Sequence, residues 1–276
     1  MNGAVHALYD TLARYEWWRR RRDRGAMELR KRLAPAAAAP ADSGEAFDRW
    51  LFDMVRPADG ATVVDFGCGF GASLLRWVEW TGGAGIGVTG SPFQAARLLE
   101  VAARRGLGSR VRVLVQDFAA PIDVRADVVL AIEAFGHAAD LDAVLANVHA
   151  SLGSGGTLVW VEDLLARELR DDADVQELAR RWSSPPLRDR AGAAAAAART
   201  GLPIRREVDL TARVAAGDAA AVARRAAQLA RWRAMVPFRP WHRLADAFLG
   251  GCALERLYAR GEACYVARLC DRVDAP

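Results

Sequence analysis

The residues best suited to chemistry lie in one short stretch, residues 63–71, which reads Val-Val-Asp-Phe-Gly-Cys-Gly-Phe-Gly. Three alternating glycines after an apolar run allow a tight turn from strand to helix and a close approach of the backbone to a ligand. Such turns hold the pyrophosphate of dinucleotides, but Asp65 would repel that anion and attract a ligand with ammonium and sulfonium centres. The stretch therefore predicts a small cationic ligand; the alternative is a turn that serves packing alone.

Asp65, Gly67, Gly69 and Gly71 resemble motif I of the class I S-adenosylmethionine-dependent methyltransferases. In that family an acidic residue and the glycine loop hold the methionine portion of the cofactor. The resemblance therefore implies that these four residues bind S-adenosylmethionine and that S-adenosylhomocysteine is the product. It covers residues 47–162 by sequence and the remainder by the order of the expected elements.

The next segment narrows the resemblance to a subgroup. Residues 87–94 read Gly-Val-Thr-Gly-Ser-Pro-Phe-Gln, where most class I members carry an acidic residue for the ribose hydroxyls. The segment is similar to Gly-Val/Ile-Thr-Leu-Ser-Pro-x-Gln in methyltransferases of sterols, tocopherols, cyclopropane fatty acids and other small molecules. Thr89, Ser91 and Gln94, together with the amides of a helix N-terminus, can hydrogen-bond a ribose. Gly90 departs from the usual leucine.

Two further positions carry expectations from the family. After the third expected strand, Asp117 and Phe118 stand where members place an acidic or amide side chain against the adenine amino group and a ring beside it. Alternatively, Asp117 only caps a turn.

The fourth expected strand ends in Glu133 and His137, which we interpret as catalytic residues. Ligands of a doubly wound sheet lie outside the carboxyl ends of its strands, so this loop should face the transferable methyl group. Glu133 can take a proton from an amine, a hydroxyl or a cation left by methylation of an alkene, and His137 can do the same or orient the substrate. Alternatively, Glu133 binds the cofactor or a backbone amide, and His137 begins the next helix.

Methyl transfer needs an enclosed, dry pocket more than covalent help. Aromatic side chains in the N-terminal segment and near the end of the chain could wall such a pocket and steady a cation. The candidates for substrate binding are Tyr9, Tyr15, Trp17, Trp182 and Trp241. Arg231, Arg233, Arg239, His242 and Arg243 suit an anionic substrate group or, alternatively, a solvated helix face.

Alternating strands and helices predict an α/β fold with a doubly wound, Rossmann-like sheet of seven strands. The expected strands are residues 62–66, 85–88, 111–115, 127–132, 157–161, 203–210 and 263–269, the last forming an antiparallel edge. Helices are expected over residues 5–32, 73–80, 91–105, 141–152, 172–182, 188–200, 217–233 and 241–260. Ser43 is a plausible N-cap for a further helix that ends at Pro57.

The order of elements divides the chain into two parts. Residues 1–42 form an N-terminal helical lid or arm with a linker at residues 35–40, and residues 43–276 form the methyltransferase domain. Insertions at about residues 163–188 and 211–261 are longer than hairpins need, and we expect them to form a helical cap before the last strand.

Charge, cysteine content and the absence of targeting motifs restrict the partners and the location that can be expected. The net charge is +4, but acidic residues interleave with the arginines, and Lys31 is the single lysine. We interpret the basic cluster of residues 19–32 as a solvated arm, or alternatively as a site for an anionic partner. The four cysteines lack metal or disulfide spacing, so no metal is expected. No signal sequence, membrane segment or nucleic-acid motif is recognisable, which predicts a cytoplasmic protein without nucleic-acid or membrane partners.

The sequence thus favours S-adenosylmethionine-dependent methylation of a small molecule in secondary metabolism. Resemblance to sterol, tocopherol and prenyl-diphosphate C-methyltransferases favours C-methylation of an isoprenoid-like acceptor, with or without an anionic group. N- or O-methylation of another natural product and a non-methylating, cofactor-binding relative are the alternatives. The aromatic N-terminal helix is also suited to pairing in a homo-oligomer.

Overall fold

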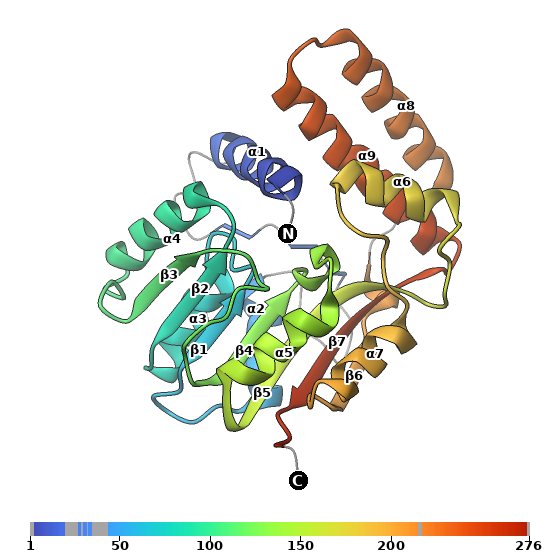
Figure 1. Ribbon diagram of the computed structural model, residues 1–276. Coiled ribbons are helices and arrows are strands. Elements are labelled where there is room, and N and C mark those ends of the chain that lie inside the picture. Colours follow the sequence, from blue (N-terminus) through green and yellow to red (C-terminus); the bar gives the residue numbers. More distant parts are fainter. Residues whose placement is uncertain are drawn as a thin grey trace.

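The computed structural model describes residues 3–19, 27–28, 30–31, 33–34, 44–214 and 217–274, with side chains from residue 7 onward. A mixed sheet with the strand order β3-β2-β1-β4-β5-β7-β6 forms the centre of this part (Figure 1). The strands are β1 (Val63–Phe66), β2 (Gly85–Thr89), β3 (Val111–Val115), β4 (Ala126–Ile132), β5 (Leu152–Leu165), β6 (Ile204–Asp209) and β7 (Ala263–Asp271). The predicted doubly wound α/β sheet of seven strands is confirmed.

The first five strands are parallel, because a crossover follows each of β1 to β4. The helices among and around them are α2 (Gly44–Val55), α3 (Ala72–Thr81), α4 (Pro92–Arg104), the short η1 (Phe135–His137) and α5 (Leu141–Ser151). Ser91 caps α4 by accepting a hydrogen bond from the amide of Gln94, and Asp140 caps α5 in the same way.

The last strand was expected at an edge of the sheet, and this expectation is wrong. β7 is antiparallel, but it lies between β5 and β6 and pairs with both. Its residues Ala263 to Cys270 are all buried, whereas Arg205 and Arg206 of β6 are exposed. Burial on both sides favours an apolar strand in the interior, and charged residues suit the edge.

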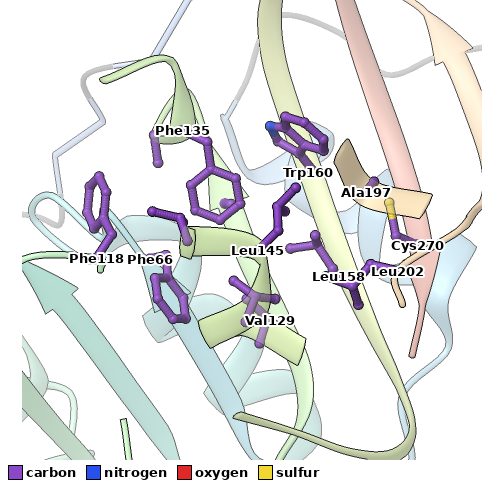
Figure 2. Close-up of a cluster of buried hydrophobic side chains, with 14 of the residues drawn as sticks. Phe66, Phe118, Val129, Phe135, Leu145, Leu158, Trp160, Ala197, Leu202 and Cys270 are labelled. Carbon is purple, nitrogen blue, oxygen red and sulfur yellow. The ribbon is translucent and has the colours of Figure 1, made fainter. Parts of the chain in front are cut away.

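Two apolar cores lie on opposite faces of the sheet. One joins Phe66, Phe135 and Trp160 to α5 and to α7 (Arg190–Arg199) (Figure 2). The other joins Val63 to α2, α3 and α4. Val63 and Val64 are neighbours on β1 and enter different cores, as the alternation of side chains along a strand requires.

The predicted insertions contribute α6 (Ala173–Trp182), η2 (Thr211–Arg213), α8 (Ala219–Met235) and α9 (Arg239–Ala259). Val175 and Leu178 of α6 share a small apolar core with Ala253, Leu254 and Leu257 of α9. α8 and α9 form a hairpin that projects from the sheet on the side of α1 (Figure 1). We call α6, α8 and α9 together the cap.

The N-terminal helix is shorter than expected. α1 spans Gly3–Arg19, and the described residues between 27 and 34 are not helical. Leu33 instead forms an isolated antiparallel bridge with Val214. Ser43, the residue 35–40 linker and most of the basic cluster lie outside the described residues. We call residues 27–34, as far as they are described, the strap.

Candidate active site

A cavity of about 430 Å³ lies at the carboxyl ends of β1, β2, β4 and β5. These four strands are parallel neighbours, so their ends meet at one edge of the sheet, where ligands of doubly wound folds bind. Side chains from α1, the strap, α6 and α9 complete the lining. The lining therefore combines the sheet edge expected from the sequence with elements from both ends of the chain.

Asp65 stands at the end of β1 in this lining and is only 4% exposed. Burial raises the pKa of its carboxyl group to about 8, the nearby Asp48 adds to the increase, and Arg30 opposes it. None of the described residues donates a hydrogen bond to Asp65. A buried carboxyl group in these surroundings is a suitable partner for a cationic ligand group.

The three glycines after β1 have left-handed backbone conformations but different surroundings. Gly67 and Gly71 have φ of 80° and 79°, and a Cβ atom on Gly71 would lie 2.4 Å from Cγ of Leu98. Gly69, with φ 53°, lines the cavity, and a Cβ atom on this residue would meet no heavy atom within 4 Å. Gly71 therefore allows close packing of helices, whereas Gly69 leaves the backbone open to a ligand.

The residues expected to bind a ribose, Thr89, Ser91 and Gln94, are buried together in the lining. The Thr89 hydroxyl donates to the Gln94 side-chain oxygen at 2.8 Å. The Ser91 hydroxyl donates to Asp10 of α1 at 2.7 Å while it caps α4. These contacts fix the three side chains and connect α1 to the sheet.

Of the two residues expected at an adenine ring, only Phe118 lines the cavity. Phe118 is buried and packs near Phe66 and Phe135. Asp117 accepts a hydrogen bond from the amide of Ala119 at 3.0 Å, which is the turn-capping role considered as its alternative. Its carboxylate is therefore engaged in the local turn in this structure.

Glu133 follows β4 and has φ of 53°, a conformation that side-chain-bearing residues rarely adopt. Such a conformation costs on the order of 1 kcal/mol and is concentrated at functional sites. Its Oε1 atom accepts hydrogen bonds from the backbone amide of Lys31 at 2.9 Å and from the Tyr265 hydroxyl at 2.8 Å. The strap and β7 therefore hold this carboxylate in the cavity.

His137 belongs to η1 and is 8% exposed. Burial lowers the pKa of its imidazole to about 4, so the ring is neutral at pH 7 although Asp163 opposes the shift. Nε2 contacts the Tyr9 hydroxyl of α1, while the buried Nδ1 has no hydrogen-bond partner in the described part of the chain. The ring also lies near Trp182, with 5.9 Å between ring centroids.

Glu162 and Asp163, at the end of β5, are lining residues that sequence reasoning missed. Burial raises the pKa of Glu162 to about 8, assisted by the nearby Asp163, while the Gly136 amide donates to its carboxylate at 2.9 Å. Asp163 accepts hydrogen bonds from the Tyr258 hydroxyl and from Nζ of Lys31, the latter at 2.7 Å. The adjacent acidic residues directly after an apolar strand were the available signal.

Lys31, the single lysine of the chain, was also missed as a site residue. Its ammonium group lies 5.3 Å from the centroid of the Tyr265 ring and 5.5 Å from that of Tyr258. The carboxylates of Asp163 and Glu133 raise the pKa of this ammonium group, although burial opposes them. Lys31 therefore joins two acidic residues of the cavity to the strap.

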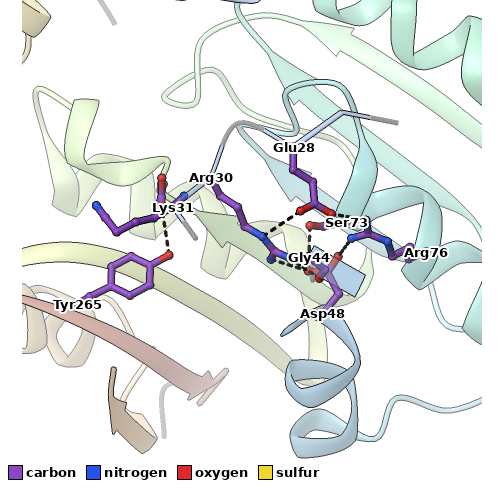
Figure 3. Close-up of polar contacts among 9 residues, drawn as sticks. Glu28, Arg30, Lys31, Gly44, Asp48, Ser73, Arg76 and Tyr265 are labelled. Carbon is purple, nitrogen blue, oxygen red and sulfur yellow. Dashed lines mark hydrogen bonds and ion pairs between the residues drawn. The ribbon is translucent and has the colours of Figure 1, made fainter. Parts of the chain in front are cut away.

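The strap is tied to the helices behind the glycine turn by a second ionic network (Figure 3). Asp48 of α2 is fully buried and accepts hydrogen bonds from Arg30 at 2.8 Å, from Ser73 at 3.0 Å and from Arg76. Glu28 pairs with Arg76. The interpretation of the basic cluster as a solvated arm is thus wrong for Arg30 and Lys31, because buried carboxylates hold both of them.

The aromatic residues expected to bind substrate separate into two groups. Tyr9 and Trp182 line the cavity, but Tyr15, Trp17 and Trp241 do not. Tyr15 and Trp17 support the wall from behind: Tyr15 meets the edge of Phe248, and Trp17 stacks on Phe70 with 5.8 Å between centroids. Trp241 is 42% exposed and packs against Trp232 at the end of the cap hairpin.

The arginines expected to bind an anionic substrate are not lining residues either. Arg233 pairs with Asp246, and His242 contacts the carbonyl of Val236. Within the described residues, no cluster of three or more His, Cys, Asp and Glu side chains is arranged to hold a metal ion. No helix of that part is long and apolar enough to span a membrane.

Comparison with known proteins gives a family match over much of the chain. The model of a family described as "Methyltransferase domain" matches residues 17–199 of the 276 residues. Sterol 24-C-methyltransferase ERG6B from Gibberella zeae is 30% identical over 143 residues, which are 49% of this chain and 37% of that relative. The match therefore spans little more than a third of that curated relative.

Two solved structures share the fold over nearly the whole chain. Geranyl diphosphate C-methyltransferase from Streptomyces coelicolor, solved with Mg²⁺, geranyl diphosphate and S-adenosylhomocysteine, has a TM-score of 0.69 and 21% identity, and covers 96% of this chain and 98% of that one. The [4+2]-cyclase SpnF has a TM-score of 0.71 and 20% identity, with 98% and 96% of the two chains covered. At these identities the likeness establishes the fold alone.

Proposed function

Because the chain belongs to the family of methyltransferase domains, we propose that it is an S-adenosylmethionine-dependent enzyme that methylates a carbon atom of an isoprenoid-like small molecule. The observation that carries this proposal is the cavity itself. One end holds the buried, raised-pKa Asp65 beside the open Gly69 backbone, and the other holds Glu133, Glu162 and Asp163 beside aromatic rings. The first end fits a cationic cofactor and the second fits an acceptor that becomes cationic.

The residues at the first end fit S-adenosylmethionine. Asp65 has a buried carboxyl group without a hydrogen-bond donor among the described residues, and Gly69 leaves room for close approach to the backbone. Asp65 and Gly69 would hold the methionine portion, Thr89 and Gln94 would contact the ribose, and Phe118 would pack beside the adenine. When bound, the cofactor supplies an activated methyl group. The protein's part is to orient this group and exclude water.

Proton removal is the task of the other end of the cavity. Methylation of an alkene carbon leaves a positive charge on the acceptor, and loss of one proton restores a neutral product. Glu133 is the proposed base, because Lys31 and Tyr265 fix Oε1, while Oε2 accepts no hydrogen bond from the described residues. The neutral His137 and the hydroxyl of Tyr9 would orient the acceptor.

Two observations favour carbon as the methylated atom. Tyr9, Trp182 and Phe248 place aromatic rings in the lining, and rings together with carboxylates stabilise a transient cation. The proteins similar to this chain include C-methyltransferases of a sterol and of geranyl diphosphate. Secondary metabolism in the cytoplasm is the setting that we propose for such an activity.

Incubation with methyl-labelled S-adenosylmethionine and a panel of acceptors tests the proposal. The panel contains isoprenoid alkenes with and without a diphosphate group, and matched amines and phenols. Label in an alkene product is the expected result. Label confined to amines or phenols would make the enzyme an N- or O-methyltransferase. Tight cofactor binding without label in any product would identify a non-methylating relative and overturn the proposal.

A further inference from the structure

The turn that joins α8 to α9 exposes large apolar side chains that no described part of the chain covers. Met235, at the end of α8, is 73% exposed, Phe238 is 64% exposed and Trp241 is 42% exposed. Pro237 and Pro240 lie between them and are also exposed. Three large side chains so close together in sequence form an apolar tip rather than the scattered exposure that is normal for a protein surface.

Arginines surround this apolar tip. Arg231, Arg239 and Arg243 are exposed, and no carboxylate of the described chain pairs with any of them. Three other arginines of the two helices have partners: Arg225 pairs with Glu255, Arg233 pairs with Asp246, and Arg256 pairs with Asp174 and Glu177. Of the four arginines of the hairpin without a paired carboxylate in the described chain, three therefore lie at the tip, and Arg224 lies near the start of α8.

The shape of the hairpin separates the tip from the core. Val222 is the single buried residue of α8, so this helix packs by one narrow stripe onto α9. The connecting turn lies at the end of the hairpin away from the sheet (Figure 1). The edge-to-face pair of Trp232 and Trp241, with 5.3 Å between centroids, orders this end of the hairpin.

We propose that the α8–α9 tip docks on the surface of an anionic lipid bilayer. Exposed Met, Phe and Trp side chains insert at the level of the headgroups, where tryptophan is enriched, and arginines contact the negatively charged headgroups. Charge complementarity selects this occupant over a second copy of the chain, because two such tips would bring six unpaired arginines together. The proposal replaces the expectation, drawn from the sequence, that the protein has no membrane partner.

The tip and the cavity lie close together on α9, so docking of the tip would bring the cavity close to the bilayer. Ala247 and Phe248 of α9 line the cavity, and Trp241 lies six residues earlier, about 9 Å along the helix axis. A tip in the headgroup layer would hold the cavity close to the bilayer. Apolar acceptors partition into that layer, so docking would deliver the class of acceptor proposed above.

Vesicle co-sedimentation of the full chain tests the docking without cofactor or acceptor, so its outcome does not depend on methyl transfer. Vesicles of phosphatidylcholine alone are compared with vesicles that also contain phosphatidylglycerol. Binding is expected to the mixed vesicles and should weaken as salt is raised, because salt screens exposed charges. A double variant, Phe238→Ser with Trp241→Ser, and a triple variant, Arg231→Gln with Arg239→Gln and Arg243→Gln, should each bind at least about tenfold more weakly.

A second triple variant provides the matched control. Arg167→Gln, Arg170→Gln and Arg199→Gln remove the same charge from side chains that are 65%, 82% and 59% exposed, and this variant should bind like the parent. Unchanged thermal unfolding would show that the tip variants are folded. Equal binding to both kinds of vesicle, or full binding by both tip variants, would overturn the proposal. Tip-dependent self-association without vesicle binding would also overturn it and would assign the tip to an interface between copies.

Discussion

At the scale of single residues, the two ends of the cavity hold carboxyl groups in different surroundings. Asp65 is buried, none of the described residues donates a hydrogen bond to it, and burial raises its pKa to about 8. Glu133 is held by the Lys31 amide and the Tyr265 hydroxyl in a strained backbone conformation. The first arrangement is suited to binding a cation, and the second is suited to accepting a proton from the substrate.

Asp65→Asn should weaken S-adenosylmethionine binding at least about tenfold, because it removes the charge that compensates the ligand's cation. Binding to the parent should release protons below about pH 8, since a cation beside Asp65 lowers a pKa that burial has raised to about 8. Calorimetry in buffers with different ionisation enthalpies measures both quantities. Proton release that persists in Asp65→Asn would contradict the assignment of these protons to Asp65. Because the pKa of Glu162 is also raised to about 8, Glu162→Gln tests whether that carboxyl group releases them instead.

The same substitution should stabilise the ligand-free protein. The folded state binds a proton at Asp65 that the unfolded state releases near pH 4, so this residue makes stability fall as pH rises from about 4 to about 8. Asp65→Asn should therefore raise the melting temperature at pH 8 more than at pH 4. A melting temperature lowered equally at both pH values would show that Asp65 is a structural residue.

Lys31→Met should move the acidic limb of the kcat/KM profile to higher pH. The substitution removes the cation that pairs with Asp163 and interacts with Glu133 and Glu162, so protons bind more readily to the acidic end of the cavity. Lys31→Arg keeps the charge and should restore most of the profile. If the acidic limb were unchanged in Lys31→Met, the charge of Lys31 would have no influence on proton binding in the cavity.

At the scale of elements, the strap connects the two ends of the cavity. Its Arg30 pairs with Asp48 behind the glycine turn, and its Lys31 pairs with Asp163 beside the proposed base. Tyr9 and Asp10 of α1 add contacts to His137 and Ser91. α1 and the strap thus enclose the cavity, and the side chains of Tyr9, Asp10, Arg30 and Lys31 are held at its two ends.

Asp48→Ala should lower the free energy of unfolding by about 3–5 kcal/mol, because it leaves Arg30 and Arg76 without the buried carboxylate that both of them contact. Asp142→Ala is the matched control, since its pair with Arg199 is exposed and worth at most about 1 kcal/mol. Urea denaturation measures both changes. Equal losses in the two variants would show that the buried network contributes no special stability.

At the scale of the whole molecule, the sheet and the part of the cavity lining around the glycine turn could be predicted, because both depend on local patterns. The strand, glycine turn and helix at residues 63–81 are recognisable because the residues that form them are contiguous in the sequence. Residues predicted from such local patterns line the cavity, among them Asp65, Gly69, Thr89, Ser91, Gln94 and Phe118. The place of β7 inside the sheet was missed, because strand order depends on which edges are buried and not on local alternation.

The acceptor end was predicted less well, because it is assembled from distant segments. Glu162 and Asp163 follow an apolar strand that was expected to end at residue 161, whereas β5 continues to Leu165. Lys31 was expected within a helix over residues 5–32, but the described residues of the strap are not helical, and Nζ of Lys31 reaches Asp163. The hydrophobic periodicity of the sequence gives no indication of that contact. Trp241 and Trp182 were both predicted to bind substrate because both are aromatic. Trp182 lines the cavity and Trp241 is exposed at the tip, a difference that depends on tertiary packing.

Glu133→Gln tests the central claim most directly, because it changes the proposed base and leaves the cofactor end untouched. Calorimetry and single-turnover transfer of labelled methyl groups should be measured on the same preparation. The account predicts unchanged affinity for S-adenosylmethionine and methyl transfer slowed by about 10²-fold to 10⁴-fold. Normal transfer by Glu133→Gln would contradict the account and reduce Glu133 to a structural residue.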